Sequence, residues 1–327
     1  MKLCEYCLPY EVSASHIVER GEFLLWPITK LLDQLKPPTP GSGVLKLLLA
    51  VGLLKLVELR RDDDRISRRS QVLVNEAIGR GLDIKLMTLF GKPVNLFSIV
   101  SGGQRLFFEG LPHVRIGTAF EFDVDNKEKF GRLLEGLDYP HTGSKIFLSV
   151  WRAKSHARLI SYPVVVKPNK GSLSKHVTYP VNNEEELVRA IKIARMIAPE
   201  FIVERFVSGK VHRISVVDYE HIAVCIREPL IEGGKVTLAA GARIHDVTEL
   251  VHPDNADMFR NLARACKLSV IGFDFICADI SRPYKDQKCA FIEANSLPFI
   301  DMHHYPTTGK SLNVAAWIMD ELEAERL

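Results

Sequence analysis

The sequence predicts an α/β protein in which short apolar strands alternate with amphipathic helices. Apolar runs such as Ile84–Leu89 and Phe201–Glu204 have the length and boundaries of buried strands. The segment Asn183–Ala198 instead places apolar residues at helical spacing, after a capping asparagine and a first turn of glutamates. A chain of 327 residues is long enough for a large core divided into two or three subdomains.

Composition is typical of a globular protein, with 46% hydrophobic and 25% charged residues. The net charge of +3 is too small to indicate nucleic acid, and the basic tract Arg60–Arg69 is offset by Asp62, Asp63 and Asp64. Met1–Tyr10 lacks the apolar core of a secretory signal. Six cysteines without regular spacing suit reduced thiols, so we expect a cytoplasmic protein.

Residues 1–66 are expected to form an N-terminal helical and linker region. Cys4 and Cys7 form a CxxC pair without a second ligand pair nearby, which favours ordinary thiols over a zinc site. The apolar run Val44–Leu59 is interrupted by Lys46 and Lys55 and is shorter than the roughly 20 residues of a membrane span. This run therefore predicts a buried helix or an oligomer contact, and we expect no membrane partner.

Residues 67–120 predict a small α/β domain. The expected elements are a helix at Ser70–Arg80 and strands at Ile84–Leu89, Leu96–Val100 and Leu106–Glu109. No glycine fingerprint follows these strands, so nothing in them indicates dinucleotide binding.

The remainder of the chain, from residue 121, continues the alternation. A helix is expected to start at Asp125–Lys127, and a strand at Val164–Pro168 carries Lys167 near its end and is followed by a polar loop. Further strands are expected at Ile214–Val217 and Ile222–Ile226, and further helices at Asp254–Cys266 and Ser311–Glu323.

Two apolar runs, Ile271–Ile276 and Cys289–Ile292, predict a hairpin that carries polar side chains. Asp274 lies within the first run, Glu293 ends the second, and Asn295 follows. Side chains two apart on a strand share a face, and strand pairing can bring Asp274 to the same face. Because buried acids need a partner and oxygen donors suit a hard cation, this set predicts a Mg²⁺ site.

From about Asp125 onward, this order of elements resembles the ATP-grasp enzymes. The resemblance implies a small pre-ATP-grasp domain (67–120), followed by two α+β subdomains that clasp the nucleotide. The ATP-grasp domain would span 121–327, with a central entry (121–162), a subdomain of the lysine strand and glycine loop (163–206) and a C-terminal catalytic subdomain (207–327).

The resemblance implies how ATP would bind. Lys127 and Lys167 match the two lysines that reach the phosphates, and Glu204 matches the acceptor of the adenine amino group. The implied nucleotide-binding set is Lys127, Lys167, Gly171, Ser172, Glu204, Arg205, Phe206 and Val207.

The resemblance also implies catalytic residues. Arg213 and Arg227 match basic positions near the phosphates or the bound acid, and His303 is expected to contact substrate without transferring a proton. Together with Lys167 they form the expected catalytic set. Asp274, Glu293 and Asn295 would hold two Mg²⁺ ions between the phosphates.

The motifs "GFDFICADIS" and "EANSLPFIDMHHYPTTGKSLNVA" are most similar to the ATP-grasp domains of cyanophycin synthetase and of the two-function glutathione-making enzymes. The implied activity is an ADP-forming carboxylate–amine ligation through an acyl phosphate. The implied substrates are amino acids or a peptide end, and many such relatives are homo-oligomers.

Some positions depart from the family pattern. Ser174 and His176 stand where glycines of the phosphate loop are expected, with Lys175 and His176 as alternative phosphate contacts. Val211 replaces a ribose-binding acid, and Phe299 stands where glycine is common.

Three alternatives stay open: a D-alanine–D-alanine-type ligase, an ATP-binding regulator without turnover, and a hydroxyl kinase. Gly272 argues against the first, because it occupies the position of an arginine in those ligases.

Overall fold

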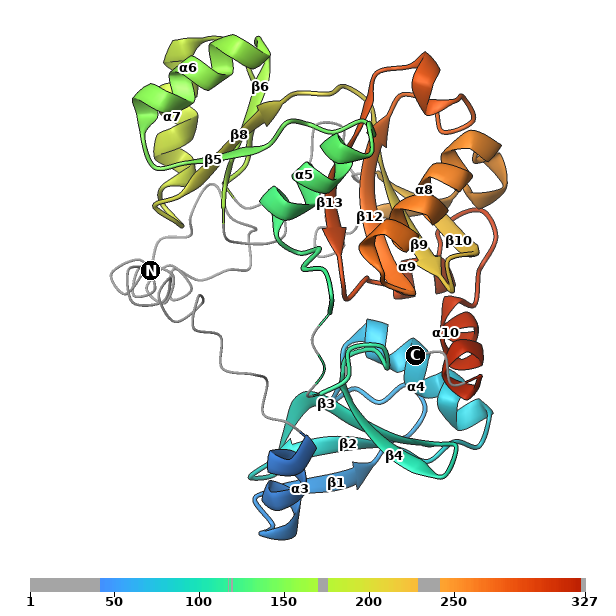
Figure 1. The fold of residues 1–327 in the computed structure, drawn as a ribbon. Helices are drawn as coiled ribbons and strands as arrows, with labels where there is room; N and C mark the ends of the chain where they lie inside the picture. The colour runs from blue at the N-terminus through green and yellow to red at the C-terminus, as the bar shows by residue number, and fades with distance from the viewer. Residues whose placement is uncertain (1–41, 117, 119, 170–175, 229–241, 325–327) are drawn as a thin grey trace.

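The computed structural model describes residues 42–116, 118, 120–169, 176–228 and 242–324. Within these ranges the strands form three antiparallel sheets, two of four strands and one of five. Figure 1 shows the sheets as separate layers, with helices packed on them. This arrangement confirms the predicted mixed α/β class.

The first sheet has its strands in sequence order: β1 (Leu54–Glu58), β2 (Ile84–Leu89), β3 (Lys92–Ser101) and β4 (Gln104–Glu109). Helix α4 (Arg68–Gly79) packs on one face, and α3 (Ser42–Ala50) contributes to a smaller apolar cluster beside Met87 and Phe107. The three predicted strands and the predicted helix are confirmed. The interpretation of Val44–Leu59 as one buried helix is wrong, because a turn with Gly52 at φ +75° separates α3 from β1.

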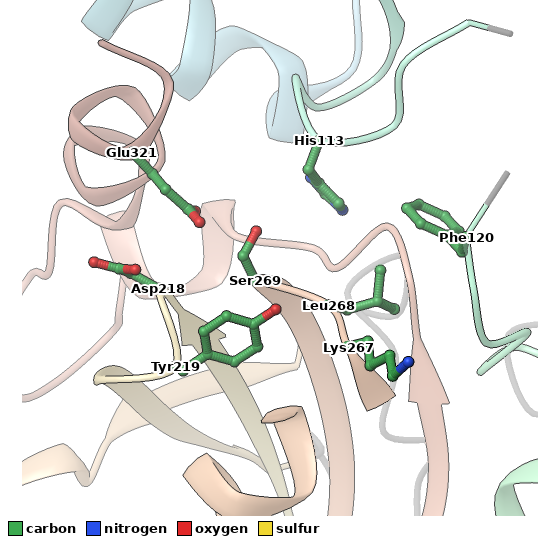
Figure 2. A pocket seen from close by; sticks show the side chains of 8 residues that line it. All are labelled: His113, Phe120, Asp218, Tyr219, Lys267, Leu268, Ser269 and Glu321. Atoms are coloured by element: carbon green, nitrogen blue, oxygen red, sulfur yellow. The ribbon is translucent and has the colours of Figure 1, made fainter. Parts of the chain in front are cut away.

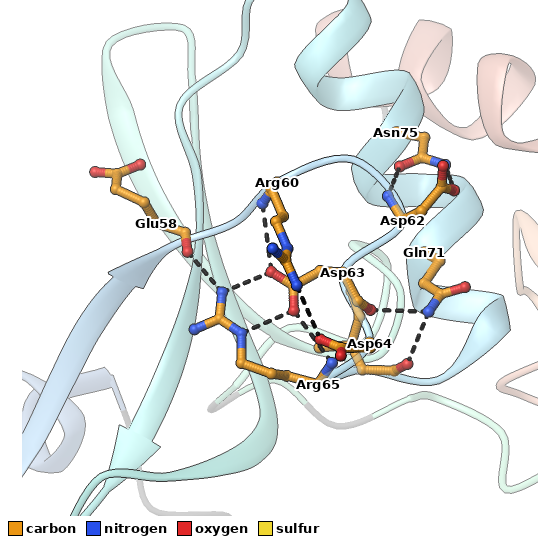
Figure 3. Close-up of polar contacts among 9 residues, drawn as sticks. Glu58, Arg60, Asp62, Asp63, Asp64, Arg65, Gln71 and Asn75 are labelled. Atoms are coloured by element: carbon orange, nitrogen blue, oxygen red, sulfur yellow. Dashed lines mark hydrogen bonds and ion pairs between the residues drawn. The ribbon is translucent and has the colours of Figure 1, made fainter.

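The connection from β1 to α4 is organised by one buried carboxylate, Asp63 (Figure 3). Its oxygens accept hydrogen bonds from Arg65 Nε at 2.7 Å and Nη2 at 2.6 Å, and from the backbone amides of Arg60 and Arg65. The hydrogen bonds from the Arg65 side chain hold the pKa of Asp63 well below its usual range, against the opposing effect of burial. The acidic residues of this tract therefore form contacts within the β1–α4 connection itself.

The second sheet has the order β5 (Lys145–Phe147), β8 (Phe201–Arg205), β6 (Val164–Pro168) and β7 (Thr178–Val181). Helices α6 (Val150–Ile160) and α7 (Glu184–Ala194) cover one face and bury Val164, Val166, Phe201 and Val203. Helix α7 begins as predicted, since Asn183 Oδ1 accepts a hydrogen bond from the Glu186 amide. By alternation, Lys167 and Glu204 point to the opposite face.

The third sheet has the order β11 (Arg243–Asp246), β10 (His221–Glu228), β9 (Lys210–Val217), β12 (Val270–Cys277) and β13 (Cys289–Asn295). Helices α5 (Lys127–Gly136) and α8 (Pro253–Cys266) pack on one face, over a core rich in phenylalanine. The predicted hairpin is confirmed as β12 and β13.

The other face of the third sheet carries α9 (Asp301–His304) and α10 (Val314–Glu323). Residues of α10, of α4 and of the first and third sheets share one apolar cluster, so α10 joins the N-terminal sheet to the C-terminal one (Figure 1). Among the described residues, no helix combines the length and apolar character needed to cross a membrane.

Candidate active site

The predicted metal residues meet on one face of the third sheet. Asp274 lies directly opposite Glu293, and Gly272 lies opposite Asn295. The register shifts between Asp274 and Phe275, because Phe275 pairs with Phe291 while Ile292 is the extra residue of a β-bulge. The bulge turns Glu293 and Asn295 toward Asp274, away from the phenylalanine core.

Two arginines from neighbouring strands face Asp274, which is only 6% exposed. Arg213 Nε lies 2.8 Å from Asp274 Oδ1, and Arg227 Nη2 lies 3.6 Å from Oδ2. Neither Arg213 Nε nor Asp274 Oδ1 has a hydrogen-bond partner within the described ranges, so the contact is an ion pair without an aligned hydrogen bond. Burial raises the pKa of Asp274 to about 6, and Glu293 adds to this effect while the arginines oppose it.

Glu293 connects this sheet to two lysines from earlier parts of the chain. Burial raises its pKa, but Arg213, Lys127, Lys167 and Arg227 together outweigh burial, and the net direction is down. Lys127 begins helix α5 after the capping residue Asn126. Burial and the nearby Lys167 lower the pKa of Lys127, while Glu293 and Glu204 oppose them. The second and third sheets therefore present their charged side chains to a common space.

Lys167 and Glu204 form a buried ion pair, with Nζ and Oε1 2.5 Å apart. Glu204 Oε2 accepts hydrogen bonds from the hydroxyls of Thr142, at 2.9 Å, and Ser144. Both oxygens of Glu204 are thus engaged, and the carboxylate holds the lysine on the open face of the second sheet. The sequence analysis missed Thr142 and Ser144, although the polar turn His141–Ser144 before β5 is a visible signal.

The expected hinge residues follow Glu204 at the end of β8. The Arg205 amide donates to the Thr142 carbonyl at 2.9 Å, and the Phe206 amide donates to the Pro163 carbonyl at 3.1 Å. These two N–H groups are therefore used within the protein. Nucleotide contacts through the carbonyls of Arg205 and Phe206, and through the Val207 backbone, stay a prediction.

His303 lies on α9 and is only 1% exposed. Its Nε2 is 2.9 Å from Ser215 Oγ, and burial lowers its pKa to about 3. The ring of His303 is therefore neutral and enclosed, and its expected substrate contact stays a prediction.

The phosphate loop is described only at its end, because Gly171, Ser172, Ser174 and Lys175 lie outside the described residues, as do Cys4 and Cys7. His176 is 2% exposed, and its Nδ1 lies 3.0 Å from the Ile193 carbonyl. The phosphate contact considered for the His176 side chain is therefore wrong. Its backbone has φ +54°, in the left-handed region that favours glycine.

The donor set fits a hard cation. Asp274 Oδ1 is a buried oxygen without a hydrogen-bond partner in the described part of the chain, beside a second carboxylate and an amide. No group of three or more His, Cys, Asp or Glu side chains is placed to hold a metal in the described ranges. A Mg²⁺ site here would depend on the Asn295 amide and on oxygens of the bound nucleotide.

A cavity of about 320 Å³ lies elsewhere, between the N-terminal domain and the end of β9 (Figure 2). Its lining includes His113, Phe120, Tyr219, Ser269 and Glu321, and none of the predicted site residues. We therefore place the candidate active site where the charged side chains of the second and third sheets meet, and not at this cavity.

Comparisons with known proteins show which families the chain is similar to. Residues 148–237, which contain Lys167 and Glu204, match the family model described as the D-ala D-ala ligase C-terminus. Cyanophycin synthetase of Trichormus variabilis is 26% identical over 222 residues, covering 49% of this chain and 25% of that protein. The glutathione biosynthesis bifunctional protein of Clostridium perfringens is 21% identical over 324 residues, covering 77% of this chain and 40% of that protein.

A solved structure has a similar fold. The bifunctional glutathione synthetase of Pasteurella multocida superposes with a TM-score of 0.57 at 19% identity, covering 79% of this chain and 43% of that one. The chain spans only about a quarter of the length of the cyanophycin synthetase it matches. These similarities confirm the resemblance inferred from the sequence motifs.

Proposed function

Because the chain has the ATP-grasp fold and is related in sequence to ATP-grasp ligases, we propose that it is an ATP-dependent carboxylate–amine ligase. It would join an amino acid or a peptide end to an amine and release ADP and phosphate. The proposal extends to a cytoplasmic enzyme that uses ATP and two Mg²⁺ ions.

One observation carries the proposal: four cationic side chains converge on the carboxylates of β12 and β13. Lys127 and Lys167 come from α5 and the second sheet, and Arg213 and Arg227 come from the third sheet. Four cationic side chains around the carboxylates of β12 and β13 are suited to bind a polyanion such as a nucleoside triphosphate.

The chemistry would proceed in two steps. A carboxylate oxygen of the acid bonds to the γ-phosphorus of ATP as the bond from that phosphorus to the β–γ bridging oxygen breaks, which gives an acyl phosphate and ADP. The amine nitrogen then bonds to the acyl carbon, the carbon–oxygen bond to phosphate breaks, and the amine releases a proton to solvent. Amide and inorganic phosphate remain.

The residues have distinct tasks in this scheme. Lys127 and Lys167 would bind phosphate oxygens, with Glu204 holding Lys167 in place. Arg213 and Arg227 would stabilise charge on the transferred phosphoryl group. Asp274, Glu293 and Asn295 would hold Mg²⁺, which supplies charge neutralisation at the β- and γ-phosphates. The first step requires no general base, since a carboxylate is already ionised at neutral pH.

The packing around Gly272 favours this assignment over a D-alanine–D-alanine-type ligase. A Cβ at this position would lie 2.8 Å from Pro298 Cβ, so no side chain fits without displacement of the loop that follows Asn295. An arginine at this position, as in those ligases, has no room here.

The test is a hydroxylamine-trapping screen of amino acids and short peptides with ATP and Mg²⁺. We expect an acyl hydroxamate and equimolar ADP with at least one acid, and neither product from Lys167→Ala. The matched control is Lys145→Ala, which removes an exposed lysine of the same sheet and should retain activity. Binding of ATP without any ADP release would instead support the regulator, and a phosphate ester found by mass spectrometry would support the kinase.

A further inference from the structure

The turn that follows β13 is held by hydrogen bonds to three other segments of the chain. The Ser296 amide donates to Asp125 Oδ1 at 3.0 Å, and the Ser296 hydroxyl donates to Asp125 Oδ2 at 2.6 Å. The Ser296 carbonyl accepts a hydrogen bond from His113 Nε2 at 2.6 Å, and the Leu297 carbonyl accepts one from Arg69 Nη1 at 2.8 Å. We call this set, Asp125, Ser296, Leu297, His113 and Arg69, the Ser296 joint.

We propose that Asp125 is a positioning residue that fixes Lys127 relative to Glu293 and Asn295 through its two hydrogen bonds to Ser296. The proposal rests on the proposed function only in assigning ATP as the ligand of Lys127. Asp125 precedes Lys127 by two residues, and Ser296 directly follows Asn295. The Ser296 joint therefore links the start of α5, which carries Lys127, to the end of β13, which carries Glu293 and Asn295.

The strength of the joint follows from its chemistry and burial. Hydrogen bonds to an ionised carboxylate are stronger than those between neutral groups, and the paired oxygens also fix orientation. Ser296 is only 8% exposed, so water has little access to its amide and hydroxyl, although the Asp125 carboxylate itself is exposed.

The body of α5 is held separately, by apolar packing. Phe130 stacks on Phe273 with ring centroids 6.1 Å apart and meets Phe291 edge-on at 6.3 Å. Loss of the joint should therefore release the first turn of α5, which carries Lys127, while the helix stays on the sheet.

The N-terminal domain contacts the same turn closely. A Cβ at Gly110 would lie 3.0 Å from Leu297 Cδ2 and 3.3 Å from Arg69 Nη2, so this approach requires glycine, which also has φ +65°. Arg69 also lies over the Phe299 ring, with 5.1 Å between the guanidinium carbon and the ring centroid. The N-terminal domain thus supports the joint from outside the ATP-grasp part of the chain.

The experiment compares Asp125→Ala with Asp123→Ala by calorimetric titration of Mg·ATP, which needs no turnover. Asp123 is the matched control, since it lies on the same connection and its carboxylate forms a surface ion pair with Lys129. We expect Asp125→Ala to raise the Kd for ATP about tenfold and Asp123→Ala to leave it within about twofold. Ser296→Ala, a milder variant, should raise the Kd by a smaller factor and add nothing in the Asp125→Ala background.

Several outcomes would overturn the proposal. One is an ATP affinity of Asp125→Ala equal to that of Asp123→Ala, and another is a loss of affinity accompanied by a fall in Tm that Asp125→Asn does not reverse. Asp125→Asn retains one acceptor for the Ser296 amide and should recover part of the affinity. If the wild-type chain binds ATP but forms no hydroxamate, the ligase proposal fails while the joint is still tested by the same titrations.

Discussion

Two buried aspartates, Asp63 and Asp274, each lie beside an arginine and behave in opposite ways. Asp63 receives two aligned hydrogen bonds from Arg65 and two from backbone amides, and its pKa is held well below the usual range. Asp274 faces Arg213 without an aligned hydrogen bond, and burial raises its pKa to about 6. The first carboxylate completes a structure within the chain, whereas Oδ1 of the second has no hydrogen-bond partner among the described residues.

The largest expected effect is on activity at Asp274. Replacement by asparagine should lower kcat/KM by about a thousandfold, or roughly 4 kcal/mol of transition-state stabilisation. The free energy of unfolding should change little, because removal of a charge that burial disfavours is offset by the loss of the carboxylate partner of the buried Arg213. Urea unfolding and the hydroxamate assay measure the two quantities, and a loss of stability comparable to that of an Asp63 variant would erase the contrast.

Asp63→Ala should show the reverse pattern. The variant loses the hydrogen bonds that order the β1–α4 connection, so its free energy of unfolding should fall by about 2 kcal/mol. Turnover per folded molecule should be unchanged, because this loop belongs to the first sheet. Asp64→Ala is the control, since Asp64 forms only an exposed ion pair with Arg60. A drop in kcat at full folding would contradict the structural role of Asp63.

A smaller effect is expected at Glu204, whose carboxylate accepts hydrogen bonds from hydroxyl groups. Thr142→Val removes a hydrogen bond to Glu204 while keeping the side-chain volume, and should raise the KM for ATP about fivefold, or about 1 kcal/mol. The value of kcat should change less, because Lys167 keeps its ion pair with Glu204. Steady-state kinetics at varied ATP measure this split. Thr118→Val, at an exposed threonine whose hydroxyl bonds only to the nearby Arg115 carbonyl, should leave KM unchanged.

The smallest effect concerns pH. Burial lowers the pKa of His304 from 6.5 to about 4, and its Nε2 accepts a hydrogen bond from the Ala315 amide at the start of α10. Because the unfolded chain binds the proton more readily, stability is complete above about pH 7 and falls as pH decreases through 6.5 toward 4. Between pH 7.5 and 6 the expected loss from this one group is about 0.8 kcal/mol.

His304→Gln keeps an acceptor for the Ala315 amide but does not titrate. Urea unfolding at the two pH values should therefore show a smaller pH-dependent loss for this variant than for the wild-type chain. Asp63 contributes equally at both values, because its pKa lies far below this range. An unchanged slope in His304→Gln would contradict the assignment.

Local signals in the sequence predicted much of the fold. The β12–β13 hairpin, the start of the helix at Asp125–Lys127 and the capping residue Asn183 depend on residues close in the chain, and each is found where expected. The prediction of one helix for Val44–Leu59 was wrong, because apolar content alone does not distinguish a helix from a strand.

The candidate site was less predictable, because its contacts join distant segments. The ion pair of Lys167 with Glu204 depends on the pairing of β6 with β8, and the hydroxyl of Thr142 reaches it from a third segment. The enclosure of His303 depends on how α9 packs over the sheet. Residue types indicated which groups to expect near ATP, but not which of them already bind one another.

The bulge at Ile292 has a consequence for how this chain tolerates changes in length. In an unbroken ladder, Ile292 would lie opposite Asp274, and Glu293 would project into the layer of Phe273 and Phe275. Deleting that one isoleucine would restore a regular ladder that keeps Glu293 opposite Asp274, whereas closing the bulge with Ile292 retained would bury the acid in the aromatic layer. The spacing of residues along β13 is as much a requirement of this site as their identity.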